Sequence, residues 1–253
     1  MSASSAIIRL TLLEALRVRL AWIVAAAILL ALGLAAFLDQ VALIESRAIQ
    51  AAVVAATVRF IAAFIVIIFD VTSMVRESSD KVTELLLSQP ISRAAYYWAK
   101  LAGYVALAVV VGLALSLPLA FTLPGLGLAC WVLSLLLELA LVAAASLFFV
   151  LSLNQVAPAI AAAGGFYLLS RVMDTLQLIA GAQTHSSSLA DRTVDGLVSA
   201  LALLLPSLGR MTNAAWIAQP PPAALLGSLA GQALIYMGLL AGAALFDLYR
   251  KNL

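Results

Sequence analysis

Charged residues are scarce in this sequence, and their scarcity excludes a soluble protein. Only 10% of the 253 residues are Asp, Glu, Lys or Arg, whereas 65% are hydrophobic. A soluble domain carries about 25% charged residues, so this chain must use lipid as its main solvent. The net charge of +2 is small and no basic run accompanies it, which argues against nucleic acid as a partner.

Cysteine and histidine are almost absent. Cys130 and His185 are the single representatives of their types, which excludes an internal disulfide and any metal site built from several such ligands. His185 has serines beside it and Asp191 six residues on, but no G-x-S-x-G motif, so a Ser/His/Asp hydrolase is disfavoured. We expect no metal and no catalytic residue.

Long apolar runs, in contrast, are abundant. The hydrocarbon core of a bilayer is about 30 Å thick and needs about 20 apolar residues in helical form. Six runs reach that length, whereas Val194 to Leu208 is shorter and contains Pro206, which favours short re-entrant or interfacial helices before the last span. We predict an all-α membrane protein, with an amphipathic N-terminal helix and one transmembrane domain over residues 1–253. The predicted spans are residues 20–38, 53–75, 99–121, 129–151, 156–180 and 224–246.

The distribution of Lys and Arg predicts the orientation of the spans. Six spans place both termini on one side of the membrane, and an excess of Lys and Arg marks the cytoplasmic side. With both termini cytoplasmic, residues 76–98 are also cytoplasmic and residues 181–223 form an external element. The cytoplasmic side then holds Arg9, Arg17, Arg19, Arg76, Lys81, Arg93, Lys100, Arg250 and Lys251, and the rest of the 14 basic residues are Arg47, Arg59, Arg171, Arg192 and Arg210.

The most polar part of the chain is "MVRESSDKVTELLLSQPISRAAYYWAK", residues 74–100. Val82 to Ser88 forms helix readily, and Pro90 ends that helix because it forces the preceding residue out of the helical region. Ser92 can cap the next helix. We expect Glu77, Asp80, Lys81 and Glu84 to be available to water or to a partner. A solvated loop with an interfacial helix is the simplest interpretation of this segment.

The same segment resembles the cytoplasmic segment of type-2 ABC transporter permeases. In that family it forms the coupling helix, which docks in a groove of a separate ATPase subunit and transmits its closure. Val82 replaces the glycine that usually precedes the threonine of the family. The resemblance assigns ATPase coupling to Arg76, Glu77, Thr83, Glu84, Leu85, Leu86, Pro90, Ser92 and Arg93; Leu87 and Lys100 fit the family pattern as well.

The resemblance implies the membrane-spanning subunit of an ATP-driven transporter of the bacterial inner membrane, most simply an exporter. Six spans make half of such a transporter, so the route would form between two permease subunits, identical or closely paralogous. No glycine is followed by lysine, so the G-x-x-x-x-G-K-S/T phosphate loop is missing. ATP and magnesium would therefore bind two copies of a partner ATPase, and no cofactor is expected in this chain.

Two other functions remain open from the sequence. The chain could be a secondary transporter or channel that uses intramembrane charges. It could also be a non-transporting scaffold that lends ATPase-driven motion to the maturation of an extracytoplasmic partner. The segment and the chain length are similar to permeases that serve nitrous-oxide reductase maturation, where a periplasmic accessory protein would be a further partner.

Ionisable residues at membrane depth are expensive and become functional candidates. Glu138 is the plainest case, with Arg59 and Arg171 as its expected partners. It could form a buried ion pair that orients helices, or line the substrate route. Arg171 and Asp174 are three residues apart on one helical face and could pair with each other. Arg59 and Asp70 lie nearer the ends of their span and are expected to snorkel towards water.

Four glycines of the last span fall on one helical face: Gly227, Gly231, Gly238 and Gly242. Small residues at this spacing let helices approach closely. We expect this face to pack within the subunit, with a contact between two subunits as the alternative.

Overall fold

The computed structural model describes residues 3–41, 47–80, 92–122, 125–182 and 221–250, with residues 193, 196, 198–201, 204–212 and 216 between the last two ranges. These residues form helices and contain no strand, which confirms the predicted all-α class. The elements in chain order are α1 (Ala3–Arg17), α2 (Leu20–Val41), α3 (Arg47–Ser79), α5 (Arg93–Thr122), α6 (Leu126–Leu153), α7 (Val156–Ala182), the 3-10 helix η1 (Leu208–Thr212) and α9 (Ala223–Arg250).

Six of these helices are long and apolar enough to cross a membrane, as the sequence predicts. They are α2, α3, α5, α6, α7 and α9, and each contains one of the six predicted apolar runs. The helices extend past those runs, most clearly α3, which reaches from Arg47 to Ser79. A helix does not have to end where its apolar stretch ends, because its backbone bonds stay satisfied in the interfacial region.

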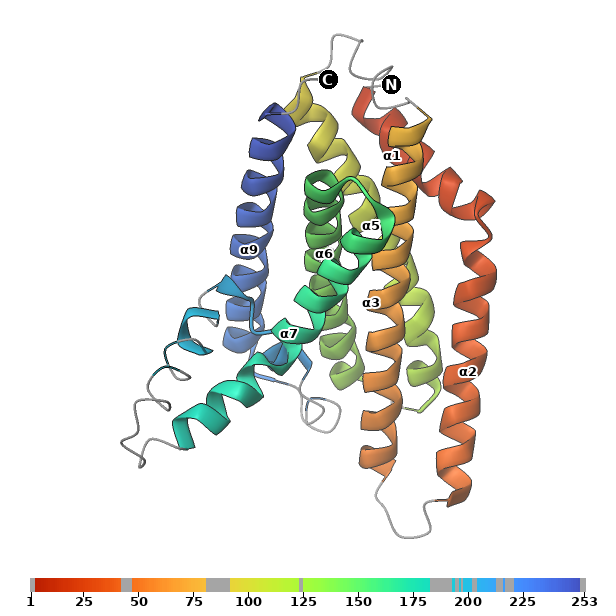
Figure 1. The fold of residues 1–253 in the computed structure, drawn as a ribbon. Coiled ribbons are helices and arrows are strands. Elements are labelled where there is room, and N and C mark those ends of the chain that lie inside the picture. Colours follow the sequence, from red (N-terminus) through yellow and green to blue (C-terminus); the bar gives the residue numbers. More distant parts are fainter. Residues whose placement is uncertain are drawn as a thin grey trace.

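The long helices form a bundle around α6 (Figure 1). Helix α6 packs against α3, α5, α7 and α9, and it buries a consecutive run from Leu139 to Leu147. Alanine and serine dominate the second half of that run. Small side chains allow neighbouring helices to approach closely, which is how helices associate in lipid without a hydrophobic driving force. The alanine-rich sequence therefore explains why α6 takes the central position.

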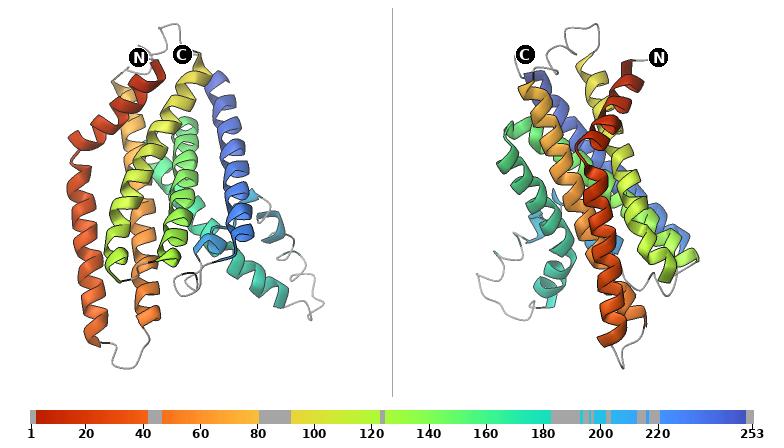
Figure 2. Two further views of the ribbon diagram at one scale, coloured as in Figure 1. Left: turned by 180° about the vertical axis from the view of Figure 1, so that it is seen from behind. Right: turned by 90° about the vertical axis from the view of Figure 1, so that its right-hand side faces the viewer.

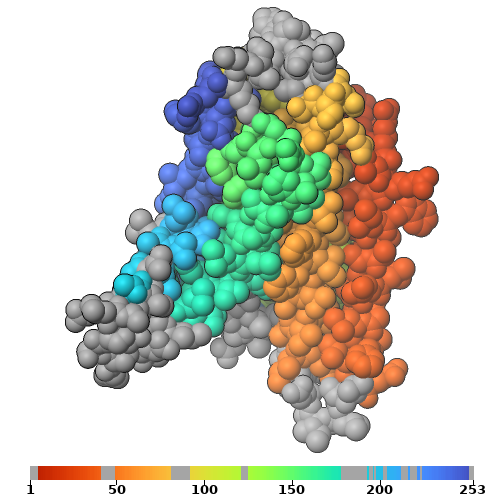
Figure 3. Space-filling view, in the orientation of Figure 1, coloured from red at the N-terminus to blue at the C-terminus, as the bar shows by residue number. Residues whose placement is uncertain are grey.

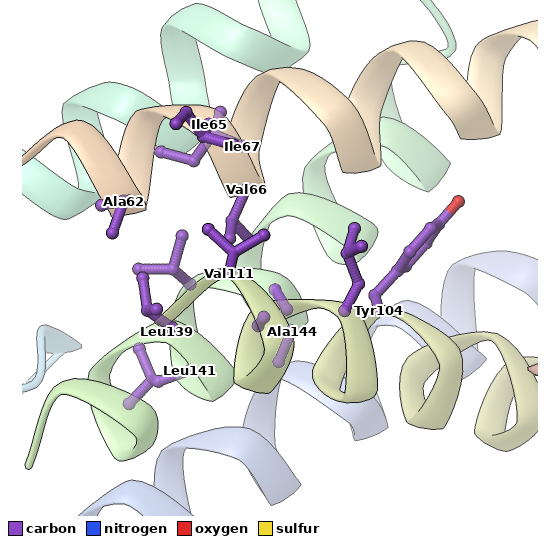
Figure 4. Close-up of a cluster of buried hydrophobic side chains, with 14 of the residues drawn as sticks. Ala62, Ile65, Val66, Ile67, Tyr104, Val111, Leu139, Leu141 and Ala144 are labelled. Carbon is purple, nitrogen blue, oxygen red and sulfur yellow. The ribbon is translucent and has the colours of Figure 1, made fainter. Parts of the chain in front are cut away.

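The core beside α6 is built from side chains of three helices (Figure 4). Ala62 and Val66 of α3, Val111 of α5 and Leu139 of α6 are all buried there. At Gly112 of α5, an added Cβ would lie 2.9 Å from Leu136 Cδ2 and 3.0 Å from Leu139 Cδ1. Glycine at this position therefore lets α5 approach α6 without displacing these leucine side chains.

The beginning of α1 and the end of α9 lie at the same end of the bundle, beside the end of α3 and the start of α5 (Figures 1 and 2). Helix α1 lies at an angle to α2 and packs on α5, where Thr11 Oγ1 would be 3.1 Å from a Cβ at Gly103. The predicted N-terminal helix is therefore present. It buries Ile7, Thr11 and Ala15 along one stripe.

Helix α7 packs against α6 and α3, and on the face shown in Figure 3 it runs obliquely beside α3. The turn before it is as short as predicted: Asn154 adopts the left-handed conformation (φ 54°) and donates its N–H to the Val150 carbonyl. Asparagine tolerates this conformation better than most residues. Beyond α7, η1 packs on α7 and α6. It supplies one of the predicted short helices before the last span, although most of residues 183–220 lie outside the described part.

The glycine face of α9 does not pack as we expect from the sequence. Among the residues that the structure describes, a Cβ added at Gly227, Gly231, Gly238 or Gly242 would meet no neighbouring atom within 4 Å. Packing within the subunit is therefore the wrong interpretation of this stripe. Helix α9 instead packs against α6, and it buries Leu229, Ala233, Ala241 and Ala244.

Candidate functional site

Two clusters of polar side chains are buried in the bundle. The central cluster consists of Arg59, Ser134, Glu138, Tyr167 and Arg171. The end cluster lies where α3 ends and α5 begins, and consists of Glu14, Asp70, Ser73, Glu77, Lys100 and Tyr104. Both bring residues together that are far apart in the sequence.

Glu138 is the centre of the first cluster, and its side chain is fully buried. Its Oε2 forms an ion pair with Arg59 of α3. Its Oε1 accepts from Arg171 Nη1 at 3.2 Å and from the Tyr167 hydroxyl at 3.1 Å, both on α7. Both carboxylate oxygens therefore have partners, and the charge of Glu138 is neutralised within the protein.

Arg59 is equally well enclosed, with 1% of its side chain exposed. Its Nη2 donates to the Ser134 hydroxyl and, at 3.1 Å, to the Trp131 carbonyl, and its guanidinium lies 4.7 Å from the centre of the Trp131 ring. Arg171 donates to the Tyr167 hydroxyl at 3.1 Å and stacks 4.3 Å from the Phe60 ring. These contacts replace the water that two arginines lose at membrane depth.

The central cluster confirms that Glu138 pairs with both Arg59 and Arg171. Two other expectations are wrong. Arg171 pairs with Glu138 and forms no ion pair with Asp174. Arg59 does not snorkel, because α3 begins at Arg47 and therefore carries residue 59 well inside the bundle. The cluster ties α3, α6 and α7 together.

Asp174 takes a different position, facing η1. A Cβ added at Gly209 would lie 2.6 Å from Asp174 Oδ2 and 3.0 Å from the Arg171 carbonyl. The glycine thus allows η1 to lie directly on this turn of α7. Asp174 belongs to the η1 contact, and the structure does not bring it into the central cluster.

Sequence reasoning missed Ser134 and Tyr167. Each lies four residues before a residue that it did identify, Glu138 and Arg171, and therefore on the same helical face. That spacing was the available signal. A search of each candidate's i−4 position for hydroxyl groups finds both residues.

The end cluster joins α1, α3 and α5. Glu77 and Lys100 form an ion pair in which only 7% and 2% of their side chains are exposed. Ser73, one helical turn from Glu77, donates to Glu14 Oε2 of α1 at 2.7 Å. The Lys100 ammonium lies 5.6 Å from the centre of the Tyr104 ring. Buried polar contacts thus hold in place the end of α3 and the start of α5, between which the polar segment lies.

Two expectations about this end are wrong. Glu77 is not available to water or to a partner, because it is buried against Lys100. Asp70 does not snorkel either: its side chain is fully buried, and neither carboxylate oxygen has a hydrogen-bond partner among the described residues. Both residues lie on the face of α3 that meets the rest of the bundle, two turns apart.

The structure describes the polar segment only at its two ends. Ser92 caps α5, as predicted, by accepting from the Ala95 N–H at 3.1 Å. Arg93 Nη1 donates to the Leu248 carbonyl near the end of α9 at 2.9 Å. Arg76 is exposed at the end of α3. The other residues assigned to ATPase coupling, Thr83, Glu84, Leu85, Leu86 and Pro90, lie outside the described residues.

Neither cluster, as far as the structure describes it, is arranged to hold a metal ion. Among the residues that the structure describes, no group of three or more His, Cys, Asp or Glu side chains is arranged to hold a metal ion.

Compared with known protein families, the chain matches no family model. It also matches no curated protein. What these observations establish is a helical protein with six helices able to span a membrane and two buried polar clusters.

Proposed function

We propose that this chain is the membrane-spanning subunit of an ABC transporter, and that a separate ATPase binds it at residues 76–98. The observation that carries the proposal is the fixation of this segment at both ends. Glu77, just before the segment's central part, forms a buried ion pair with Lys100, just after it. Arg93 binds the carbonyl of Leu248 on α9.

This arrangement suits the transmission of force. A partner that pulls or tilts the segment acts on the end of α3 and the start of α5 together, because a buried ion pair joins them. Through Arg93 the same movement reaches α9, and through Ser73 and Glu14 it reaches α1. A loop that only connected two spans would not need ties to four helices.

The central cluster fits a structural part in the same mechanism. It holds α3, α6 and α7 together in the middle of their lengths, so that a movement of α3 is carried to both neighbours. A charge relay, as a secondary transporter would need, requires a carboxyl that can exchange partners. Glu138 is fully buried and accepts from three donors, which makes that alternative less well supported.

The remaining parts of the proposal follow from the resemblance and the distribution of basic residues. The chain would lie in the bacterial inner membrane with both termini in the cytoplasm, and would act most simply in export. Two copies, or one copy and a close paralogue, would form the route, with two ATPase subunits binding ATP and magnesium. A scaffold that couples the same ATPase to the maturation of a periplasmic partner would bind the ATPase through the same segment, residues 76–98.

The ATPase assignment is tested by reversing charges of the segment. Asp80 is exposed, whereas Glu77 is buried in an ion pair, so Asp80→Lys is combined with Glu84→Lys, and the double variant breaks no described contact. We expect the tagged double variant, purified from its native host, to lose at least about tenfold of the magnesium-dependent ATP hydrolysis that accompanies the wild type. The matched control is Asp39→Lys, an exposed carboxylate at the far end of α2.

The assignment would be overturned by any of three results. They are an equal loss of ATP hydrolysis in the control, full ATP hydrolysis in the double variant, and no ATP hydrolysis with the wild type. The double variant must also reach the membrane in normal amount, since otherwise the loss would reflect folding. An unchanged yield with lost ATP hydrolysis is the result that supports a coupling role.

The orientation has its own test. Cys130 is buried, so cysteines introduced elsewhere can be followed separately. In intact cells, Ser187→Cys should react with a membrane-impermeant thiol reagent and Ser79→Cys should react only after the cells are opened. The reverse pattern would contradict the topology.

A further inference from the structure

Asp70 is the most unusual ionisable residue of the bundle. Its side chain is fully buried, and both carboxylate oxygens lack a hydrogen-bond partner among the described residues. Glu138 is equally buried, but it has one ion pair to each oxygen. Burying a charged carboxylate without partners costs so much that such a group takes up a proton instead.

The charged groups around Asp70 do not remove that cost. Among the helices that pack on α3, the cation that acts electrostatically on Asp70 is Lys100 of α5, which is already paired with Glu77. The other charged residues of those helices lie elsewhere along them: Glu138 on α6, Asp39 on α2, Arg171 and Asp174 on α7, and Arg93 on α5. Glu14 of α1 and Glu77 of α3 add negative charge to the cluster, and Tyr104 is neutral.

We propose that Asp70 is a proton-binding site, and that the Glu77–Lys100 ion pair controls whether it holds its proton. While Lys100 is bound to Glu77, Asp70 has no countercharge and stays a neutral carboxylic acid. When Lys100 leaves Glu77, its ammonium can turn towards Asp70, which lies two helical turns from Glu77 on the same face of α3.

The step is balanced in charge and atoms. In the closed state the three groups are a carboxylate on Glu77, an ammonium on Lys100 and a carboxylic acid on Asp70. In the open state Glu77 keeps its negative charge and reaches water at the end of α3, while Asp70 gives up its proton to water and becomes the carboxylate partner of Lys100. No bond other than the O–H bond of Asp70 is broken.

The position of Glu77 and Lys100 beside the polar segment links proton release to movement of the helices. Glu77 and Lys100 flank the polar segment, so any movement that separates the ends of α3 and α5 opens the ion pair and releases one proton. Proton binding by Asp70 follows from its burial and lack of partners, and it does not depend on the identity of whatever binds the segment. A failed ATPase test would leave this proposal standing.

Infrared spectroscopy of the purified chain tests the proton directly. In a maltoside detergent, which has no ester carbonyl, only a protonated carboxyl gives a carboxylic acid carbonyl band at neutral pH. We expect such a band in the wild type, and we expect it to shift when the protein is made with aspartate carrying heavy carbon in its side-chain carboxyl. This labelling needs no substitution, so it assigns the band to an aspartate even if variants fold poorly.

Four variants test which residue binds the proton and whether the Glu77–Lys100 ion pair controls that binding. The band should disappear in Asp70→Asn and persist in Glu138→Gln, the matched change at the paired carboxylate. It should also disappear in Glu77→Gln, because the freed Lys100 then pairs with Asp70. In Lys100→Met it should persist, since Asp70 has no cation to pair with.

Each outcome is decisive. Absence of an aspartate-sensitive band in the wild type, or its persistence in Asp70→Asn, would overturn proton binding at this residue. Persistence in Glu77→Gln would overturn control by the ion pair.

Discussion

The two buried clusters differ in how completely their charges are paired, and that difference separates a fixed joint from a changeable one. In the central cluster one carboxylate accepts from Arg59, Arg171 and Tyr167. In the end cluster Lys100 is paired with Glu77 and also acts electrostatically on Asp70, which has no hydrogen-bond partner among the described residues. Two arginines on one carboxylate leave no alternative partner, whereas two carboxyls around one lysine provide one.

The positions of the clusters agree with these roles. The central cluster joins α3, α6 and α7 far from the helix ends, where polar groups have no access to water and must be satisfied internally. The end cluster lies within three turns of the end of α3, and Glu77 is close enough to that end to exchange its partner. The proposed exchange of partners is therefore located beside the polar segment, whereas the fully paired cluster lies in the middle of the bundle.

The largest effect is expected at the central cluster. Glu138→Gln removes the negative charge and leaves Arg59 buried without a counterion. Breaking a buried ion pair in this way costs about 3–5 kcal/mol. The free energy of unfolding, measured in mixed micelles by titration with a denaturing detergent, should fall by that amount.

The double variant Arg59→Met with Glu138→Gln serves as the control. It removes the stranded charge, and the side-chain amide introduced at position 138 can still accept from Arg171 and Tyr167. We expect it to recover more than half of the lost stability. If the single variant is as stable as the wild type, the central cluster is not a structural joint, and a changed transport or ATP hydrolysis rate would then place Glu138 on the route.

A smaller loss is expected at the end cluster. Lys100→Met leaves Glu77 without its cation, but Glu77 lies close to the end of α3 and can take up a proton or turn to water. We expect a loss of about 2 kcal/mol, in the range for a buried polar group that loses its partner. The same titration, run beside Glu138→Gln, measures it. A loss larger than that of Glu138→Gln would reverse the ranking of the two clusters.

Much of this architecture follows from the sequence, because length and hydropathy decide which segments span a membrane. The six spans, the Ser92 cap and the pairing of Glu138 with Arg59 and Arg171 were all predictable. Charges at membrane depth need partners, and the sequence offers few candidates. Scarcity of charge thus made the central cluster easy to predict.

The end cluster was not predictable in the same way. Glu77 and Lys100 are separated by 23 positions and by the polar segment, and the residues on either side of Glu77 are exposed. Whether Glu77 faces water or the bundle depends on the rotation of α3, which hydropathy near a helix end does not determine. The wrong prediction for the glycine face of α9 has the same cause. The spacing of the glycines identifies one face of the helix, but it does not determine which element that face contacts.

Glycine substitutions test how tightly the region around the central cluster is packed. Gly112→Ala would bring a Cβ within 2.9 Å of Leu136 and 3.0 Å of Leu139, the residue next to Glu138. These contacts are the ends of flexible leucine side chains, so we expect a loss of about 1 kcal/mol. Gly238→Ala is the matched control, with open space around it and a small gain from helix propensity. Equal effects on the unfolding free energy would contradict tight packing of α5 on α6.

The smallest effect is expected at Asp70, although its side chain is as deeply buried as that of Glu138. If Asp70 is a neutral carboxylic acid, Asp70→Asn replaces it with a neutral amide of nearly equal shape. We expect the unfolding free energy in mixed micelles to stay within about 1 kcal/mol of the wild type, the range for volume-conserving changes. The same carboxyl-to-amide change would then cost several times more at Glu138, where the carboxylate is charged and paired. A loss at Asp70 as large as that at Glu138 would mean that Asp70 is ionised and held by a partner, and the contrast between the two clusters would fail.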